Sequence, residues 1–470
     1  MTKRRVAVIG GGLAGIAAAL AAADGGAEVV LYERRSRLGG LTWSFQRNDR
    51  WFDNGQHVFL RCCTAYRALL DRIGAADQVV LQSRLDLPVL SPSGKRSSIT
   101  RSGLPAPFHL AGSVVGYRHL RPGERLAVMR AVLALRRLDP ADPALDTETF
   151  GRWLARHGQH EGAVTHLWDL IVLPTVNLAA AEASLALAVK VFRTGLLDHF
   201  DSGDIGWSKV PLRHLHGENA ARALADAGVD VRCGLRVDEL DQTGDNEWSV
   251  VWSEPVPGVD EVDAVIVATP PEATEALVPT GAIPPVKGLG ASPIVNVHFV
   301  LDRTVTDLPI AACVESPIQY VFDRTSSSVT AATSGSKALA GAQCLSISLS
   351  AADRYVGMRP EVLITTFRTA LDDIFPAARH ARLVDATVSR EHAATFRGVP
   401  GTAALRPAAR TGVPGLSVAG AWCATGWPAT MEGAVRSGNA AALEALSGTG
   451  APDRAESAEA WPEMSGRRAR

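Results

Sequence analysis

Several features are scarce in this chain of 470 residues, and each scarcity excludes a class of protein. The six cysteines, at positions 62, 63, 233, 313, 344 and 423, are few for the length and lack zinc-site spacing. No apolar run reaches the roughly 18 residues of a membrane-spanning helix. Neither sign of charge dominates, since 48 Lys and Arg residues stand against 49 Asp and Glu residues. We therefore expect a globular protein of the reducing cytoplasm with no metal site and no general affinity for nucleic acid.

The first forty residues carry a glycine-rich pattern. Three glycines spaced as G-x-G-x-x-G lie between a short apolar run and an alanine-rich stretch, and an acid ends a second apolar run about 20 residues later. In order, these are residues 6–9, Gly10, Gly12, Gly15, residues 13–23, residues 29–32 and Glu33. This is the βαβ fingerprint of a dinucleotide site.

The residue types suit that chemistry. Gly10 permits a tight turn, Gly12 lets the backbone approach a pyrophosphate, and Gly15 lets helix and strand pack closely. The helix N-terminus offers unpaired N–H groups to the phosphates, and Glu33 offers oxygens to the ribose. The alternative is a glycine-rich turn of an ordinary α/β domain. The strand, helix and acid in the expected places favour the nucleotide site.

The remaining pattern predicts mixed helices and strands. We expect a β-hairpin around residues 91–94, a polar loop over 204–215, a break in helical structure at Pro174 and a loop over 325–341. Helices are expected over residues 63–73, 122–138, 147–156, 217–227 and 360–374. Strands are expected over 229–232, 235–240, 248–252, 262–269 and 416–420, with 248–252 paired to the two that precede it.

Segments of nucleotide-fold character lie at both ends and in the middle of the chain. The sequence therefore predicts an α/β protein of two discontinuous domains, a Rossmann-like nucleotide-binding domain and an α+β substrate domain. The first is assigned residues 1–80, 212–285 and 395–448, and the second 81–211 and 286–394. Residues 449–470 are polar and are expected to form a disordered tail.

Three segments, residues 8–40, 262–271 and 416–438, together resemble the flavin amine oxidase and phytoene desaturase superfamily, which binds FAD. The pair Gly39-Gly40 after the acid is typical of those flavoproteins. The resemblance implies an amine-oxidase-like two-domain flavoprotein. Residues implied to bind FAD are Gly10, Gly12, Leu13, Ala14, Gly15, Glu33, Arg34, Gly39, Gly40, Leu41, Gly55, Gln56, His57, Val237, Ala268, Gly420, Trp427, Thr430, Met431 and Glu432.

Four shorter segments narrow the resemblance: residues 53–59, 177–184, 203–207 and 427–433. They are similar to the squalene-associated FAD-dependent desaturases, which are understood as hydroxysqualene dehydroxylases of hopanoid pathways. This implies reductive removal of an allylic hydroxyl from a C30 isoprenoid. One position departs from the pattern: Ala421 stands where the family usually carries an acid that contacts the flavin's ribityl–phosphate portion.

The C-terminal block also has a physical reason to meet a flavin. A helix that starts near Thr430 would direct unpaired N–H groups at the pyrimidine edge, where reduced flavin carries negative charge. The small residues Gly433, Ala434 and Gly438 would allow close approach. The alternative interpretation is ordinary helix packing.

Loss of a hydroxyl requires an acid, because hydroxide is a poor leaving group. His57 and Asp53 are the first candidates, with Asp204 and Lys209 behind them. Each also has a structural interpretation: His57 as a hydrogen-bonded histidine beside the flavin, and Asp53 as a residue that holds a turn. Two tryptophans are candidates to face an allylic cation, or else to pack against core or cofactor, and they are Trp207 and Trp427.

The expected partners are a hydrophobic C30 isoprenoid and a separate electron donor, since no second nucleotide fingerprint follows. Residues 104–117 are apolar and flanked by Arg101, Arg118 and Arg121. They are either a peripheral contact with the inner face of the cell membrane or a buried part of the substrate domain. A polyprenoid desaturase, an amine oxidase and a non-catalytic prenyl-binding protein of the same fold remain alternative functions.

Overall fold

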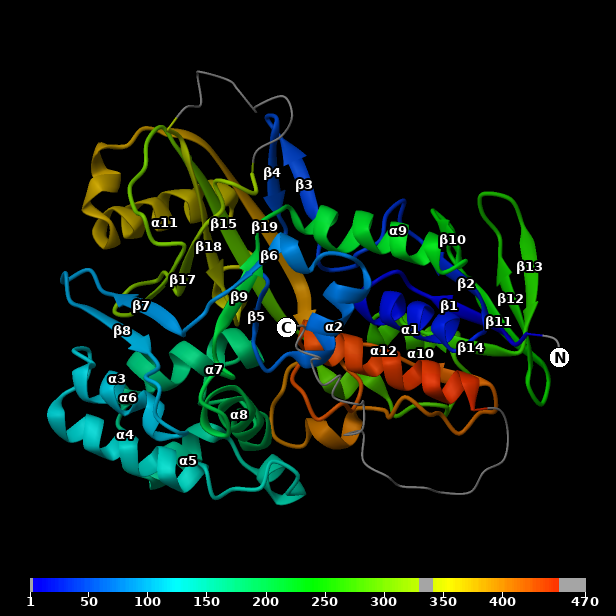
Figure 1. The fold of residues 1–470 in the computed structure, drawn as a ribbon, viewed down its shortest axis with the longest axis horizontal. Helices are drawn as coiled ribbons and strands as arrows, with labels where there is room; N and C mark the ends of the chain where they lie inside the picture. Colours follow the sequence, from blue (N-terminus) through cyan, green and yellow to red (C-terminus); the bar gives the residue numbers. More distant parts are fainter. Residues whose placement is uncertain (1–2, 329–340, 448–470) are drawn as a thin grey trace, which may run out of the picture.

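The computed structural model describes residues 3–328 and 341–447, so the predicted tail and most of the 325–341 loop lie outside the described residues. Two large sheets organise the chain (Figure 1). The first is a parallel sheet in the order β10-β2-β1-β14-β20. Its strands are β1 (Arg5–Ile9), β2 (Glu28–Glu33), β10 (Asp230–Cys233), β14 (Ala264–Val267) and β20 (Leu416–Val418).

The parallel sheet is assembled from distant parts of the chain. Its strands are short runs of Val, Ile, Leu and Ala that are buried on both faces, as helices cover the sheet. The covering and adjoining helices are α1 (Leu13–Asp24), α2 (Thr64–Arg72), α9 (Asn219–Asp226), α10 (Pro271–Leu277) and α12 (Met431–Leu446). All five strands fall in the segments assigned to the nucleotide-binding domain.

The N-terminal and C-terminal helices lie side by side (Figure 1). Gly438 of α12 faces α1 so closely that a Cβ there would lie 2.1 Å from the carbonyl oxygen of Ala14. Only a residue without a side chain permits that approach. Sequence ends more than 400 positions apart therefore form one structural unit.

The second large sheet has seven strands in the order β19-β15-β18-β17-β16-β7-β8. They are β7 (Asp86–Leu90), β8 (Arg96–Thr100), β15 (Ser292–Leu301), β16 (Ile310–Cys313), β17 (Tyr320–Asp323), β18 (Gln343–Leu349) and β19 (Leu383–Thr395). Helices of this half are α3 (Ala111–Gly116), α4 (Pro122–Leu135), α5 (Phe150–Arg156), α6 (Glu161–Ala163), α7 (Asp169–Val176), α8 (Leu185–Phe192) and α11 (Pro360–Ile374). The proposed domain boundaries themselves stay a prediction.

Three small sheets and several short helices complete the described chain. The sheets are β3 (Ser44–Arg47) with β4 (Arg50–Asp53); β5 (Val58–Leu60), β9 (Ile205–Ser208) and β6 (Val79–Leu81); and β11 (Glu239–Gly244), β12 (Glu247–Trp252) and β13 (Gly258–Val262). The π-helices are η4 (Val164–Trp168), η5 (Arg193–Leu197) and η6 (Arg213–Glu218). The 3₁₀ helices are η1 (Ala76–Gln78), η2 (Phe108–Leu110), η3 (Pro143–Thr147), η7 (Val286–Leu289), η9 (Ala352–Arg354), η10 (Pro376–His380) and η11 (Thr402–Leu405).

Two sequence-based expectations about strands are wrong. Strand β10 joins the parallel sheet beside β2 and not the strand at 248–252, and the strand predicted at 235–240 begins only at Glu239. Gly234 is the reason, because its left-handed backbone (φ +77°) turns the chain after Cys233. Residues 205–208 of the predicted polar loop form the buried strand β9.

The predicted break at Pro174 is also wrong. Pro174 lies inside α7, and the helix ends at Asn177, which is left-handed (φ +58°). A proline inside a helix removes the hydrogen bond to the carbonyl four residues earlier. Here that carbonyl belongs to Leu170, and the hydroxyl of Tyr320 donates to it at 2.6 Å. The replacement bond lets the helix continue.

Candidate active site

The turn between β1 and α1 has the geometry of a phosphate cradle. Gly10 has φ +111°, and a Cβ there would lie 2.6 Å from the carbonyl oxygen of Ala268. A Cβ on Gly15 would lie 1.8 Å from the carbonyl oxygen of Gly10. Neither position admits a side chain without moving backbone. The fingerprint glycines are thus required by this turn as it stands.

The helix that follows is open to an anion at its first turn. Gly12 precedes α1 with extended backbone and no side-chain cap. The N–H groups of Leu13 and Ala14 have no acceptor within the helix by the geometry of an α-helix, and the helix dipole adds positive potential there. The closest backbone across from Gly12 is Gly40, with 3.9 Å between Gly40 Cα and a Cβ built on Gly12. The cradle therefore fits a pyrophosphate.

Glu33 closes this end of the site. It is buried, and its two carboxylate oxygens accept hydrogen bonds from the backbone N–H of Gly11 and of Arg35, both at 2.7 Å. A carboxylate has about four lone-pair sites, so each oxygen retains capacity for a ribose hydroxyl. Arg34 beside it is exposed, Val237 is buried, and Leu41 is largely exposed.

The start of α12 offers a second set of free N–H groups. The Thr430 hydroxyl caps the helix by accepting from the N–H of Gly433 at 3.2 Å. The N–H groups of Met431 and Glu432 remain without intrahelical acceptors. The backbone here, rather than a side chain, would meet the negatively charged edge of a reduced flavin.

The side chain of Glu432 points elsewhere, contrary to a role in contacting the cofactor through its carboxylate. It is buried, accepts from the N–H groups of Ala65 (3.1 Å) and Tyr66 (2.7 Å), and pairs with Arg436 at 2.7 Å. Those two N–H groups belong to the first turn of α2, so the carboxylate caps that helix. Glu432 thus ties the C-terminal block to α2.

Trp427 is surrounded by cations. The Lys190 ammonium and the Arg436 guanidinium lie 5.1 and 5.3 Å from the centre of its ring. Cations already placed against a ring compete with any other cation for its electrons. This disfavours Trp427 as the residue that faces an allylic cation.

The segment that carries Gly55, Gln56 and His57 is held in place by its neighbour Asn54. The N–H of Asn54 donates to Trp43, and its carbonyl accepts from the side chains of Asn296 (3.0 Å) and Ser389 (2.8 Å). The Nε2 of Gln56 is buried with no hydrogen-bond partner among the described residues. An unpaired buried donor is costly, so it indicates a ligand acceptor at this place.

His57 is neutral near pH 7. Burial lowers its pKa to about 4, although the nearby carboxylate of Asp53 acts in the opposite direction. A neutral imidazole does not act as the strong acid that the sequence analysis considered. The same effect of burial lowers the pKa of His298 to about 4 and that of His216 to about 3.

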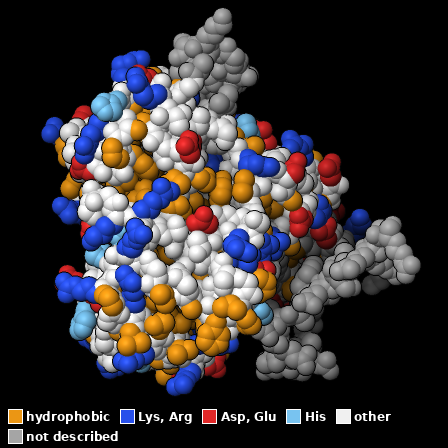
Figure 2. Space-filling model, turned by 60° about the vertical axis from the view of Figure 1, so that its left-hand side comes forward, with side chains coloured by type: hydrophobic (Ala, Val, Ile, Leu, Met, Phe, Trp, Pro, Cys, Tyr) orange, Lys and Arg blue, Asp and Glu red, His pale blue; other side chains and the backbone are white. Residues whose placement is uncertain are grey.

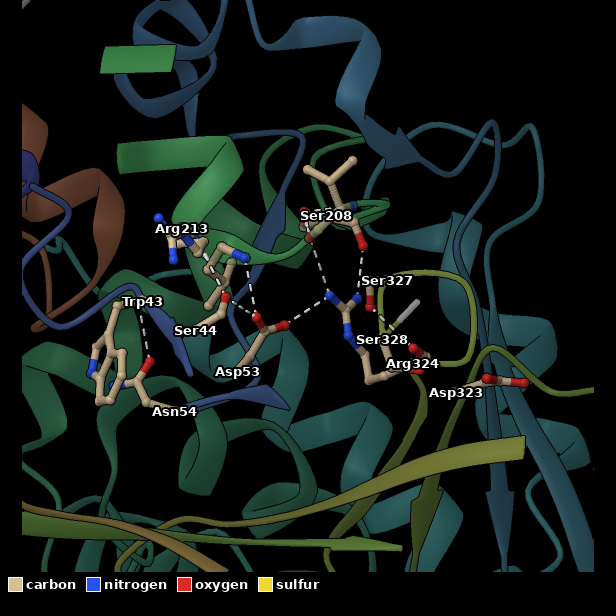
Figure 3. A network of polar contacts seen from close by, with 12 residues as sticks. Trp43, Ser44, Asp53, Asn54, Ser208, Arg213, Asp323, Arg324, Ser327 and Ser328 are labelled. Carbon is tan, nitrogen blue, oxygen red and sulfur yellow. Dashed lines mark hydrogen bonds and ion pairs between the residues drawn. The ribbon is translucent and has the colours of Figure 1, made fainter. Parts of the chain in front are cut away.

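Asp53 is one half of a buried ion pair that the sequence analysis missed. Its carboxylate lies 2.8 Å from a guanidinium nitrogen of Arg324, and it accepts from the Ser44 hydroxyl at 2.6 Å and the Leu212 N–H at 3.0 Å (Figure 3). Arg324 also donates to the carbonyl of Ser208 at 2.7 Å. Asp53 is therefore committed to positioning Arg324.

Nothing in the sequence marks Arg324. It follows β17 directly, 271 positions from its partner, in a stretch without a recognisable motif. Its Nε is buried without a hydrogen-bond partner among the described residues. A buried, permanently charged donor with one free N–H suits an oxygen of a bound molecule.

These residues enclose a cavity of about 10 Å³, which is room for about one water molecule. Four of the predicted site residues meet at it: Asp53, Gln56, His57 and Trp207. The other lining residues are Val58, Ser208, Leu212, Phe322 and Arg324.

Asp204 and Lys209, the reserve candidates for the acid, do not line this cavity. Asp204 is fully buried between Arg101 (2.6 Å) and Arg61 (2.8 Å). Burial alone would raise its pKa, but the two guanidinium groups outweigh burial and hold the pKa below its usual value. Such a carboxylate is a poor proton donor, so Asp204 has a structural role. Lys209 is exposed.

A second, larger cavity of about 300 Å³ lies between η4, α7 and the β16–β17 hairpin. Leu170, Leu173, Ile318 and Tyr320 are among its lining residues. Tyr320 stacks on Phe322, which lines the first cavity, with ring centres 6.1 Å apart. Residues two apart on a strand point to the same face, so the two cavities lie along one face of β17.

A sequence model of the family "flavin containing amine oxidoreductase" matches residues 13–446. The chain belongs to this family. Together with the dinucleotide cradle, this makes the protein an FAD-dependent oxidoreductase, as the sequence analysis expected. The assignment of individual residues to FAD contacts stays a prediction.

Similar proteins span nearly the whole chain. A hydroxysqualene dehydroxylase of Sinorhizobium fredii is 28% identical, covering 95% of this chain and 99% of its own length. A second, from Zymomonas mobilis, is 25% identical over 94% and 98%. A probable zeta-carotene desaturase of Synechococcus elongatus is 23% identical over 94% and 98%.

Solved structures agree on the fold. Putrescine oxidase bound to putrescine superposes with a TM-score of 0.68 at 20% identity, covering 94% of this chain and 99% of the other. The amine-oxidase-like two-domain fold predicted from the sequence is thereby confirmed. Among the described residues, no helix is long and apolar enough to cross a membrane.

Proposed function

We propose that this enzyme reductively removes the hydroxyl group of hydroxysqualene and releases squalene and water. The observation that carries the proposal is the similarity to three hydroxysqualene dehydroxylases, at 25–28% identity over 93–95% of this chain. The site adds chemical support, because it offers a polar space the size of a hydroxyl group in otherwise apolar surroundings.

Bound FAD, once reduced by a separate electron donor, supplies the hydride that replaces the hydroxyl group. The balance is one allylic alcohol, one hydride and one proton from solvent, giving one alkene hydrocarbon and one water. The protein must therefore compensate negative charge on the departing oxygen.

Arg324 is our candidate for that compensation. Its unpaired Nε–H would donate to the hydroxyl oxygen in the water-sized cavity, while the rest of the guanidinium stays fixed by Asp53 and the carbonyl of Ser208. A histidinium is a weaker candidate, since the pKa of His57 is about 4. Arg324 donates a hydrogen bond but keeps its own charge.

The experiment is anaerobic incubation of the FAD-loaded enzyme, reduced with dithionite, with hydroxysqualene. Gas chromatography should find squalene and consumption of the alcohol. The variant Arg324→Met should lose at least 100-fold in kcat, about the effect of removing one oxyanion donor, while still binding FAD. Arg324→Lys, which keeps the charge, should retain part of the rate.

A different outcome would identify the alternative function. Desaturase relatives keep the carotene desaturases in view at 23% identity. If the oxidised enzyme dehydrogenated a polyprenoid and the reduced enzyme left hydroxysqualene unchanged, hydride would flow toward FAD and the proposal would be wrong. Colourless protein that takes up no FAD would instead indicate a prenyl-binding protein.

A further inference from the structure

We propose that the surface built by η2, α3 and α4 docks on a bilayer of anionic lipids. We call this surface the α3–α4 face. Large hydrophobic side chains stand out of it with 47–60% of their surface exposed. They are Leu104, Phe108, Val115, Leu126 and Leu133. Scattered apolar residues are normal on protein surfaces, but a group on one small region indicates an interaction site.

The charge of the same region is strongly one-sided. Residues 95–137 contain nine Lys and Arg residues and a single acid, Glu124, although the whole chain has a net charge of −1. Two of the nine serve the fold, since Arg101 pairs with Asp204 and Arg125 donates to the carbonyl of Leu120. The other seven are exposed: Lys95, Arg96, Arg118, Arg121, Arg130, Arg136 and Arg137.

The two properties share one side of α4. Leu126, Arg130 and Leu133 are exposed and follow each other at spacings of four and three, which places them on one helix face. Residues Val128 and Ala131 are buried and form the opposite face. Figure 2 shows hydrophobic and basic side chains intermingled on the side of the molecule turned forward there.

An anionic bilayer satisfies both properties at once. The apolar side chains can enter the boundary between headgroups and acyl chains, while each cation near the surface gains from the negative potential of the leaflet. Nucleic acid would use the charge but leave the exposed Leu and Phe side chains in water. An acidic protein partner would use both, and the test below separates it.

The α3–α4 face also lies in front of the larger cavity. Tyr117, which directly follows α3, donates its hydroxyl to the carbonyl of His166 at 2.6 Å, and His166 lines the cavity. The stack of Tyr320 on Phe322 then connects that cavity to the one beside Arg324. Docking here would bring a hydrocarbon reservoir next to a path toward the site.

The test is sedimentation of the FAD-loaded protein with vesicles, in the absence of substrate. With one-third phosphatidylglycerol at 0.1 M NaCl we expect binding, which should fall at least tenfold at 0.5 M NaCl or with pure phosphatidylcholine. The double variant R118E/R130E should lower the partition coefficient at least tenfold. The double variant F108S/V115S should lower it at both salt concentrations.

Matched controls carry the same changes elsewhere. R236E/R382E reverses two exposed arginines, and V256S/V259S removes two exposed valines near β13. Both should bind vesicles within twofold of the parent. Flavin absorbance and circular dichroism identify any variant that fails to fold, and the remaining pair then decides.

Three results would overturn the proposal: no binding to anionic vesicles, equal loss in the control variants, or a change of oligomeric state in R118E/R130E with vesicle binding intact. The last would make the α3–α4 face a contact between proteins. None of these results depends on turnover, so failure here leaves the proposed reaction separately testable.

Discussion

The buried pair Asp53–Arg324 gives the sharpest energetic prediction. Both side chains are at most 10% exposed, so removal of one partner leaves the other charge buried without compensation. Such a loss costs about 3–5 kcal/mol in the free energy of unfolding. We expect that cost for Asp53→Asn and for Arg324→Met separately.

The double variant should be much less damaged than the sum of the two. Replacing both charges removes the uncompensated ion, leaving mainly the lost hydrogen bonds to Ser44 and to the carbonyl of Ser208, worth about 1 kcal/mol each. A loss of about 2 kcal/mol is then expected, and the difference from additivity measures the coupling.

Urea denaturation with saturating FAD, followed by tryptophan fluorescence, measures these values. The exposed pair Asp24–Arg72, at 2.8 Å, supplies a cycle with the same residue types. Its coupling should stay below about 1 kcal/mol, because exposed ion pairs are weak. Equal coupling in the two cycles would refute the argument that Arg324 is held as a buried charge by Asp53.

Three further predictions concern the cofactor, pH and the helix caps. Gly15→Ala should abolish FAD absorbance in the purified protein, because its Cβ would lie 1.8 Å from a backbone oxygen, whereas Gly357→Ala, in open space, should keep it. Stability should be complete above about pH 6.5 and fall by about 1.4 kcal/mol per pH unit per buried histidine as the pH drops toward 4, because the unfolded chain binds protons that the folded protein refuses; urea titrations should show a shallower fall for His298→Gln and no change for exposed His380→Gln. Glu432→Gln should lower stability by about 1–3 kcal/mol through the weakened cap on α2, seen as a lower urea midpoint, and an unchanged midpoint would contradict that role.

The nucleotide half of the protein was readable from sequence because its constraints are local. A turn that puts a Cβ of Gly15 against the preceding backbone leaves only glycine, and glycine is visible in one sequence. The acid Glu33 sits at the end of its strand for the same local reason. These features, the seven residues of the α12 start and the family were therefore predictable.

The reactive part of the site was only half readable. Asp53, Gln56 and His57 lie on one short segment, and Trp207 joins them across the strand pairing of β5 with β9. Arg324 comes from another sheet, and pairing over 271 positions leaves no local trace. Protonation was also hidden, since the neutral state of His57 depends on burial.

Errors in the secondary structure have the same origin. Pro174 stays inside α7 because Tyr320, from the far sheet, donates to the freed carbonyl of Leu170. The polar Asp204 suggested a loop, yet two arginines allow it to be buried beside strand β9. In both cases a long-range contact overrides the local preference.

The direction of hydrogen transfer tests the central claim most directly. The FAD-loaded enzyme, reduced with dithionite in D₂O under anaerobic conditions, should oxidise its flavin on addition of hydroxysqualene and yield squalene carrying one carbon-bound deuterium, measured by absorbance at the flavin band and by mass spectrometry. Flavin that stays reduced, or squalene that forms without deuterium, would contradict the reaction proposed for this site.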